Sequence, residues 1–343
     1  MIVVTEYDGD SLEWDRYVDL HPQALSYHRY GWRRVLTESF GHTAYYLMAR
    51  DSDNGVRGIL PLVHLNSRLF GNVLVSLPFV NYGGLLTDSD AASAALLDAA
   101  VKVRERLGAA HLELRHLQEV PLNLTCKEHK VTMLLPLASD PDTQWRLFNA
   151  KLRNQVRKAQ KSGLTVRWGG AELLDDFYEV FVRNMRDLGT PVYGRRLFEK
   201  VLATFPDSAR IIGVYLEDKV VAAGLAMGYR ETLEIPWASS NKDFKNLCPN
   251  NILYWEAISY AIQRGYRIFD FGRSTPGEGT YKFKEQWGAE PHPLRWQYSL
   301  KCGATLPELS PHNPKFALAI RAWQQLPLWI TRLIGPSIVR NIP

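Results

Sequence analysis

The sequence has few cysteines, no long apolar run and no secretion signal. Its three cysteines, Cys126, Cys248 and Cys302, are far apart and odd in number, which fits neither a disulfide framework nor a zinc site. No segment approaches the roughly 18 consecutive apolar residues that a membrane-spanning helix needs. The first residues lack a basic region followed by an apolar run. We therefore expect a globular, metal-free protein of the reducing cytoplasm.

Several catalytic fingerprints are also missing. The chain contains no GxGxxG, GxxxxGK[ST], HExxH or GxSxG motif, which argues against dinucleotide, P-loop, zinc-protease and serine-hydrolase chemistry. Its histidines are scattered. With 343 residues, 46% of them hydrophobic, the chain is long enough for two domains, each with its own core.

Two features recur in the same order in each half of the chain. The segments YYLMARDSDNGVRGILPL and IIGVYLEDKVVAAGLAM both have the pattern of a β-hairpin. Each is later followed by a helix-like stretch that ends at a glycine, Gly108 or Gly265, and leads into a strand with an acidic residue, Glu113 or Asp270. We infer an internal duplication of mixed α/β type, with domains at 1–137 and 138–305 and a tail at 306–343.

The second half opens with a basic helix, predicted over 151–162. Between Thr143 and Ala171 the chain has no Asp or Glu, and Leu152, Val156 and Ala159 form an apolar stripe. Cations without acidic partners repel one another, which favours an anionic ligand over a merely solvated face. The predicted residues for binding the phosphates of a donor are Lys151, Arg153, Arg157, Lys158 and Lys161.

The segment at 269–291 is the densest group of candidate functional residues. A buried strand ends near Asp270 and leads into a glycine-rich loop, which is where α/β proteins place ligands. The candidate catalytic residues are Asp270, Tyr281 and Lys284, and the candidate substrate-binding residues are Arg273, Ser274, Lys282 and Trp287. In the alternative interpretation Asp270 caps a turn, or serves the scaffold as Glu113 does, and Trp287 belongs to the core.

Three further loops contribute polar groups of the kind that converge on small-molecule sites. The candidates for substrate binding are Asn81, Tyr82, Thr190, Tyr193, Ser239, Ser240, Asn250 and Asn251.

The tail differs in composition from the rest of the chain. Residues 311–343 are rich in Trp, Leu and Ile and carry only Lys and Arg as charges. Phe316, Ile320, Trp323 and Leu326 recur at helical spacing, which predicts an amphipathic helix. This helix either packs on its own domain or lies on a membrane or a partner protein.

Four motifs in order carry a family resemblance. They are KLRNQVRKAQKSG from Lys151, DLGTP from Asp187, LCPNNILYWEAISYAIQRGYRIFDFGRS from Leu247 and YKFKEQWGAEP from Tyr281. With them the chain, over roughly residues 25 to 300, resembles the FemAB-like branch of the GNAT acyltransferase superfamily, and more closely its exosortase- and exopolysaccharide-associated members. The resemblance implies two tandem GNAT-like domains of α/β (α+β) class, each a mixed, mostly antiparallel sheet flanked by helices.

The resemblance also implies a function. It is the transfer of an aminoacyl or acyl group onto an amine of a cell-envelope or exopolysaccharide precursor, with aminoacyl-tRNA or acyl-CoA as co-substrate and no tightly bound cofactor. The [QR]xxGx[GA] turn typical of acyl-CoA users is incomplete, because RLFGNV and QKSGLT fail at the last position. The alternatives are an acyl-CoA-dependent N-acyltransferase acting on an amino sugar and a non-catalytic binding protein of a polysaccharide export system.

Overall fold

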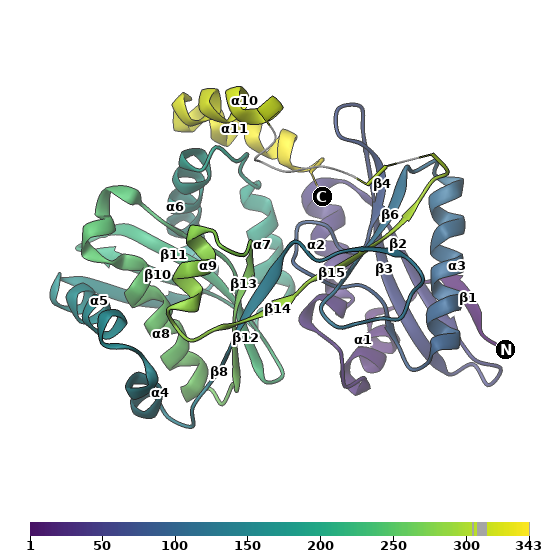
Figure 1. Cartoon of the computed structure of the whole chain (residues 1–343), viewed down its shortest axis with the longest axis horizontal. Helices are drawn as coiled ribbons and strands as arrows, with labels where there is room; N and C mark the ends of the chain where they lie inside the picture. Colours follow the sequence, from purple (N-terminus) through teal and green to yellow (C-terminus); the bar gives the residue numbers. More distant parts are fainter. Residues whose placement is uncertain (304, 307–313, 343) are drawn as a thin grey trace. The chain divides into compact units, whose positions relative to one another are not determined.

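The structure, a computed structural model, describes residues 1–303, 305–306 and 314–342, without the side chains of 314–316. It forms two compact units (Figure 1). The first unit consists of Met1–His129, Pro293–Glu308 and Arg340–Pro343, and the second of Lys130–His292 and Leu309–Val339.

The first unit is built on a mixed sheet with the strand order β1-β2-β3-β4-β6-β15-β7, in which β5 pairs with β3. The strands are β1 (Val3–Glu6), β2 (Thr43–Arg50), β3 (Val56–Ser67), β4 (Gly71–Val75), β5 (Leu86–Thr87), β6 (His111–His116), β7 (Thr125–Lys127) and β15 (Arg295–Leu300). The helices are α1 (Ser11–Leu20), the short η1 (Ser26–His28), α2 (Gly31–Phe40) and α3 (Asp90–Arg106). Helix α3 packs on β2 and β3. Strands β4 and β6 run parallel to each other, and the other strand pairs described in this sheet are antiparallel.

The second unit has a sheet with the strand order β14-β8-β13-β12-β11-β10-β9. The strands are β8 (Val131–Pro136), β9 (Leu164–Gly169), β10 (Ala209–Leu216), β11 (Lys219–Tyr229), β12 (Thr232–Ser240), β13 (Ile268–Ser274) and β14 (Glu290–Pro293). The helices are α4 (Pro141–Leu147), α5 (Ala150–Lys161), η2 (Ala171–Leu173), α6 (Leu174–Asp187), α7 (Arg195–Thr204), η3 (Lys242–Leu247), α8 (Pro249–Gln263), α9 (Gly279–Glu285), α10 (Pro314–Gln325) and α11 (Leu328–Val339).

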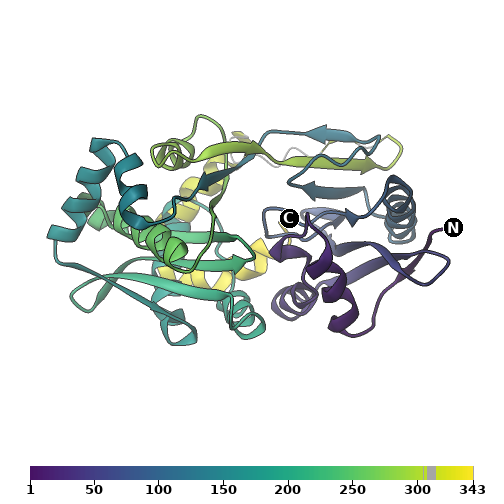
Figure 2. The same cartoon turned by 90° about the horizontal axis from the view of Figure 1, so that it is seen from below.

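Helices cover both faces of this second sheet (Figure 2). On one face α5 and α8 pack together over the strands, and the predicted stripe of Leu152, Val156 and Ala159 is buried there in a core with Ile212 and Val214 of β10. On the other face α6 packs on β10, β11 and β12. The apolar stripe of α5 therefore holds the basic helix at a fixed place on the sheet.

The internal duplication is visible at equivalent positions of the two sheets. The predicted hairpins are β2–β3 and β10–β11. Gly108 and Gly265 follow α3 and α8 with φ of 63° and 81°, the left-handed conformation expected of helix-ending glycines. Glu113 and Asp270 each occupy the last pair of the parallel ladder of their own sheet. The predicted fold class, two mixed and mostly antiparallel sheets flanked by helices, is confirmed.

Two strands join a sheet other than the one suggested by their place in the sequence. Strand β8 precedes residue 137 but pairs with β13 of the second sheet, and β15 follows β14 but pairs with β6 and β7 of the first. The unit boundaries therefore fall at residues 129 and 292, whereas the sequence analysis placed them at 137 and 305. Pairing across long sequence separations leaves no local signal in the residues themselves.

The tail forms α10 and α11, which both pack on α6 of the second unit. Trp323 of α10 is buried, while the side chain of Phe316 lies outside the described residues. Within the described part of the chain, no helix combines the length and the apolar character needed to cross a bilayer.

Candidate active site

The parallel ladder between β12 and β13 ends inside the second sheet. Its three pairs are Thr232 with Ile268, Leu233 with Phe269, and Glu234 with Asp270. Beyond that point β12 continues without pairing to β13, while β13 stays paired with β8 on its other edge through Ser274. The main chains of β12 and β13 therefore do not bond to each other after Glu234 and Asp270, and two carboxylates lie where the pairing stops.

A buried polar cluster surrounds this point. Asp270 is 1% exposed, and its Oδ1 accepts hydrogen bonds from Thr132 Oγ1 at 2.6 Å and from the Gly272 N–H at 2.7 Å. Lys284 of α9 is also buried, and its ammonium donates to the Gly272 carbonyl at 2.8 Å and to the Arg273 carbonyl at 2.9 Å. The cluster thus links the end of β13 to α9.

The protonation of Lys284 follows from these surroundings. Burial, the largest effect, lowers the pKa of Lys284 to about 8, although the carboxylates of Asp270 and Glu234 act in the opposite direction. An ammonium has three N–H donors, and backbone carbonyls take two of those on Lys284. The side chain can therefore present a positive charge and one more donor to a bound group near neutral pH.

Helix α8 begins beside the basic helix α5. Asn251 Nδ2 donates to Gln155 Oε1 of α5 at 3.3 Å. Lys151 and Lys158 are exposed and lie one turn on either side of Gln155, so they flank the start of α8. No side chain caps α8 and its first turn contains no acidic residue, which leaves the positive end of its dipole uncompensated. This arrangement is suited to an anion.

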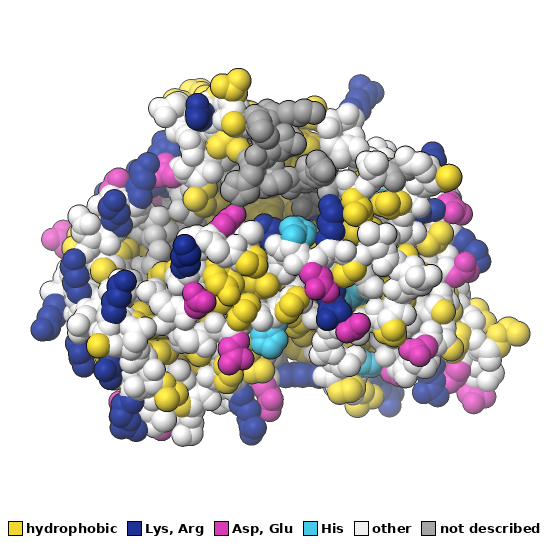
Figure 3. Space-filling model, in the orientation of Figure 1, with side chains coloured by type: hydrophobic (Ala, Val, Ile, Leu, Met, Phe, Trp, Pro, Cys, Tyr) yellow, Lys and Arg dark blue, Asp and Glu magenta, His cyan; other side chains and the backbone are white. Residues whose placement is uncertain are grey.

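The other basic side chains of α5 point to a different side of the helix. Arg157 stacks on the Trp145 ring at 5.5 Å and Arg153 is half-buried, while Lys161 is exposed. Within the described residues, no cation of α5 lies within ion-pair distance of a carboxylate. Lys and Arg side chains gather over α5 on the face shown in Figure 3. The basic side chains of α5 therefore form two separate rows. One row contains Lys151 and Lys158, and the other contains Arg153, Arg157 and Lys161.

The start of α5 also meets the end of α9. Asn149 Nδ2 donates to the Gln286 carbonyl at 3.3 Å, and the rings of Phe148 and Trp287 lie 5.2 Å apart. These contacts place α5 next to both elements that the sequence analysis singled out, the start of α8 and the 269–291 segment.

The predicted residues of the 269–291 segment divide by burial. Asp270, Ser274, Lys284 and Trp287 are buried, Tyr281 is half-buried, and Arg273 and Lys282 are exposed. Trp287 packs in the core against Phe148, Phe271 and Phe283, which was the alternative interpretation for this residue.

The remaining candidates are distributed over three places. Asn81 and Tyr82 belong to the first unit, where Tyr82 packs edge-on against Tyr27. Thr190 and Tyr193 lie in the loop after α6, which packs against α10 and α11 through neighbouring residues. Ser239 accepts a hydrogen bond from Asn184 Nδ2 at 3.1 Å, and Ser240 follows it at the end of β12.

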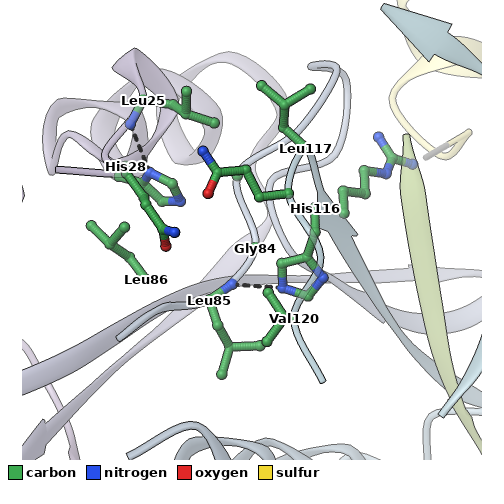
Figure 4. Close-up of a pocket in the computed structure, with 12 residues that line it drawn as sticks. Leu25, His28, Gly84, Leu85, Leu86, His116, Leu117 and Val120 are labelled. Carbon is green, nitrogen blue, oxygen red and sulfur yellow. Dashed lines mark hydrogen bonds between the residues drawn. The ribbon is translucent and has the colours of Figure 1, made fainter. Parts of the chain in front are cut away.

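The first unit contains a hollow of about 30 Å³, next to its own parallel strand pair (Figure 4). His28 Nδ1 accepts from the Leu25 N–H and His116 Nε2 from the Leu85 N–H, both at 3.0 Å, so each neutral ring keeps its proton on the other nitrogen. Burial lowers the pKa of His28 to about 3 and that of His116 to about 4. The space suits a water molecule rather than a substrate.

Three residues of the candidate site were not predicted from the sequence. Glu234 pairs with Asp270, Thr132 donates to it, and Gln155 holds Asn251. Only Glu234 has a local signal, because it is an acidic residue within the otherwise apolar strand TLEIPWA.

Comparison with known proteins agrees with this geometry. Residues 146–285 match the family described as "Acetyltransferase (GNAT) domain". This part of the chain is similar to a GNAT acetyltransferase domain. It contains the basic helix α5, the β12–β13 ladder and Lys284. No curated protein matches the chain.

Solved structures extend the likeness to both units. The chain is similar to FemX, with 16% identity and a TM-score of 0.65 over 85% of this chain and 96% of that one. It is also similar to a tandem GNAT protein from the clavulanic acid biosynthesis pathway, with 11% identity and a TM-score of 0.56 over 90% and 100%. A third similar structure is L-PGS from Bacillus licheniformis, with 14% identity and a TM-score of 0.54 over 88% and 96%. These likenesses show a tandem GNAT fold.

Proposed function

We propose that this chain transfers an aminoacyl or acyl group from an anionic donor onto an amine of a cell-envelope or exopolysaccharide precursor. The observation that carries the proposal is Lys284, a buried cation with a depressed pKa at the end of the parallel ladder of the GNAT domain. The printed name of another similar structure, a putative lysylphosphatidylglycerol synthetase from Agrobacterium fabrum (12% identity, TM-score 0.57, 85% of this chain and 93% of that one), describes an aminoacyl group joined to a phospholipid. That name supports an aminoacyl donor.

The reaction needs a group that stabilises negative charge. The acceptor amine attacks the carbonyl carbon of the donor, a C–N bond forms, and the C–O or C–S bond to the carrier breaks. In between, the carbonyl oxygen is an oxyanion, which the third N–H of Lys284 stabilises. The proton of the amine passes to Asp270, which is paired with Glu234, and then to the departing oxygen or sulfur. Tyr281, one turn before Lys284 on α9, is the hydroxyl that relays it.

The carrier of the reactive group binds where α8 begins. Lys151 and Lys158 flank the uncapped start of this helix, and Asn250 and Asn251 provide amide groups there. Helix α8 starts with Cys248 as its N-cap and Pro249 as its first residue rather than with a glycine-rich turn, and RLFGNV and QKSGLT lie elsewhere in the chain. The absence of that turn favours aminoacyl-tRNA over acyl-CoA as the donor.

Substitution of Lys284 tests the catalytic part of the proposal. In an assay of aminoacyl transfer from charged tRNA to an amine acceptor, we expect Lys284→Met to lower kcat by about 10²- to 10³-fold. Because only the protonated ammonium carries the positive charge, the wild-type rate should fall as pH rises through about 8. Lys284→Arg should retain part of the rate without that fall.

The matched control is Glu285→Gln, which changes an exposed charged side chain on the same helix and should keep the wild-type rate. If Glu285→Gln and Lys284→Met lose the same activity, or if Lys284→Met keeps the wild-type rate and pH profile, Lys284 does not have the proposed role.

A second experiment identifies the donor class and the row of α5 that binds it. Thermal-shift titrations with tRNA and with acyl-CoA should show stabilisation by tRNA alone. Lys151→Gln/Lys158→Gln should abolish the shift, whereas Arg157→Gln/Lys161→Gln should reduce it by less.

Stabilisation by acyl-CoA alone would favour an N-acyltransferase acting on an amino sugar. No shift with either, together with unchanged polymer composition in a Lys284→Ala/Arg273→Ala strain, would favour a non-catalytic binding protein.

A further inference from the structure

The last two helices attach to the second unit through one face. On α11 the buried positions Thr331, Gly335 and Val339 recur every four residues. A Cβ on Gly335 would lie 2.9 Å from Val192 Cγ1 and 3.0 Å from the Val192 nitrogen, so this seam is closely packed. On α10, Gln324 Nε2 donates to the Asp187 carbonyl at 3.1 Å, at the end of α6. The helix pair is therefore held in place by its inner face.

The outer face is apolar, and several of its described side chains are exposed. Trp329 and Leu333 are 68% and 70% exposed and lie one turn apart on α11, opposite the buried seam. Leu318 of α10 and Leu188 at the end of α6 are 77% and 60% exposed. Figure 3 shows hydrophobic side chains along the edge of the molecule where α10 and α11 lie. Single exposed leucines are ordinary, but a group of this kind marks an interaction surface.

The charged residues of the tail sequence have one sign. Residues 311–343 contain no Asp or Glu. Arg321 is exposed and has no ion-pair partner among the described residues, and Arg332 is exposed with its guanidinium 5.3 Å from the Tyr178 ring. In a twofold contact between two copies of this face, the tails would bring cations against cations and would supply no carboxylate of their own. An anionic lipid surface complements both the apolar and the cationic side chains.

We propose that the outer face of α10 and α11 docks on the surface of an anionic lipid bilayer, with both helices lying in the interface. Trp329 suits the headgroup region, where one side of an aromatic ring meets apolar chains and the other meets water. The inference is independent of the proposed transfer reaction, because none of its residues belongs to the candidate active site.

Vesicle flotation of the full chain tests this surface. We expect the protein to float with vesicles of phosphatidylcholine and phosphatidylglycerol, and to stay unbound with phosphatidylcholine alone. Leu318→Ser/Leu333→Ser should weaken partitioning by about tenfold or more, because each leucine loses apolar area in the interface. Arg321→Gln/Arg332→Gln should weaken it and reduce its dependence on salt.

The matched control is Leu12→Ser/Leu20→Ser, which changes two leucines of the first unit that are 77% and 75% exposed. It should float as the wild type does, and all variants should keep the wild-type melting temperature because the changed side chains are exposed. Absence of flotation with anionic vesicles would overturn the proposal, as would equal loss in the control. So would a wild-type dimer in solution that Leu318→Ser/Leu333→Ser converts to a monomer, because the face would then bind a second copy.

Discussion

Lys284 illustrates how much a single side chain depends on residues far from it in sequence. The YKFKEQWGAEP motif and the glycine-rich loop were enough to select Asp270 and Lys284 as candidates. Their partners were not predictable, because Thr132 reaches Asp270 through the pairing of β8 with β13, and Glu234 through the register of β12. Sequence reasoning identified chemically suitable residues, whereas the contacts that hold them follow from strand register.

The depressed pKa of Lys284 predicts a change of stability with pH. In the unfolded chain a lysine ordinarily has a pKa of 10.5, and in the folded protein that of Lys284 is about 8, so the unfolded state binds more protons between these values. The wild type should therefore gain stability relative to Lys284→Met as pH rises from 8 to 10.5, by on the order of 3 kcal/mol. The neutral amine still has two N–H groups for the two carbonyls.

Urea unfolding of both proteins at pH 7.5 and at pH 10 measures this difference. A constant difference in unfolding free energy across that range would contradict the burial of a charged Lys284.

The two buried histidines of the first unit predict acid sensitivity. The pKa values of His28 and His116 lie at about 3 and 4 when folded, against an ordinary value of 6.5, so stability present above pH 6.5 should be lost as pH falls toward 4. Each histidine should contribute a loss of about 1.4 kcal/mol per pH unit in that window. His28→Asn/His116→Gln, which keeps an acceptor for each backbone N–H, should be less stable at pH 7 but should lose less on acidification.

Unfolding in urea at pH 7, 6 and 5 checks this expectation. The exposed His292→Asn should retain the acid dependence of the wild type, and a double variant with that same dependence would show that other groups cause it.

At the scale of elements, sequence patterns predicted the positions of helices and hairpins reliably where the element buries a regular stripe of apolar side chains. The basic helix lies at Ala150–Lys161, and the two hairpins lie at the predicted residues, because periodicity and turn residues determine such elements locally. The partner of an element was less predictable. The apolar stripe of α10 was compatible with packing on its own domain and with lying on a membrane or a partner protein. The contact between α10 and α6 shows that the inner face of α10 packs on its own unit.

The contact between α11 and the loop after α6 predicts the effect of an alanine. Alanine normally stabilises a helix relative to glycine, but at Gly335 its methyl group would press on the backbone of Val192. We expect Gly335→Ala to destabilise the attachment of the tail by about 1–3 kcal/mol, seen as faster proteolytic removal of α10 and α11.

Gly194→Ala is the control, because its Cβ would meet Pro336 at 3.6 Å, an ordinary contact. Equal proteolysis of both variants would argue against the close approach at Gly335.

At the scale of the whole molecule, the duplication was predictable and the exchange of strands was not. Matching glycines and acidic residues identify the two halves in the sequence. The placement of β8 and β15 depends on pairing across more than a hundred residues, because β8 joins β13 and β15 joins β6. Domain boundaries at residues 137 and 305, drawn from sequence order alone, separate β8 from the second sheet and β15 from the first.

This exchange predicts which fragment of the second unit folds. A fragment of residues 130–292 keeps β8, with Met133 and Leu135 in the core, whereas 138–292 loses it and exposes one edge of β13. We expect cooperative thermal unfolding for the longer fragment, and aggregation or non-cooperative melting for the shorter one. Similar cooperative melting of both would show that β8 is dispensable.

Because β15 enters the first sheet between β6 and β7, the order of synthesis has a consequence. The ribosome synthesises residues 1–129 first, but the strand that fills the gap between β6 and β7 emerges only after residues 130–292 of the second unit have been translated. The first sheet must therefore wait with an open edge at β6 until β15 has been translated.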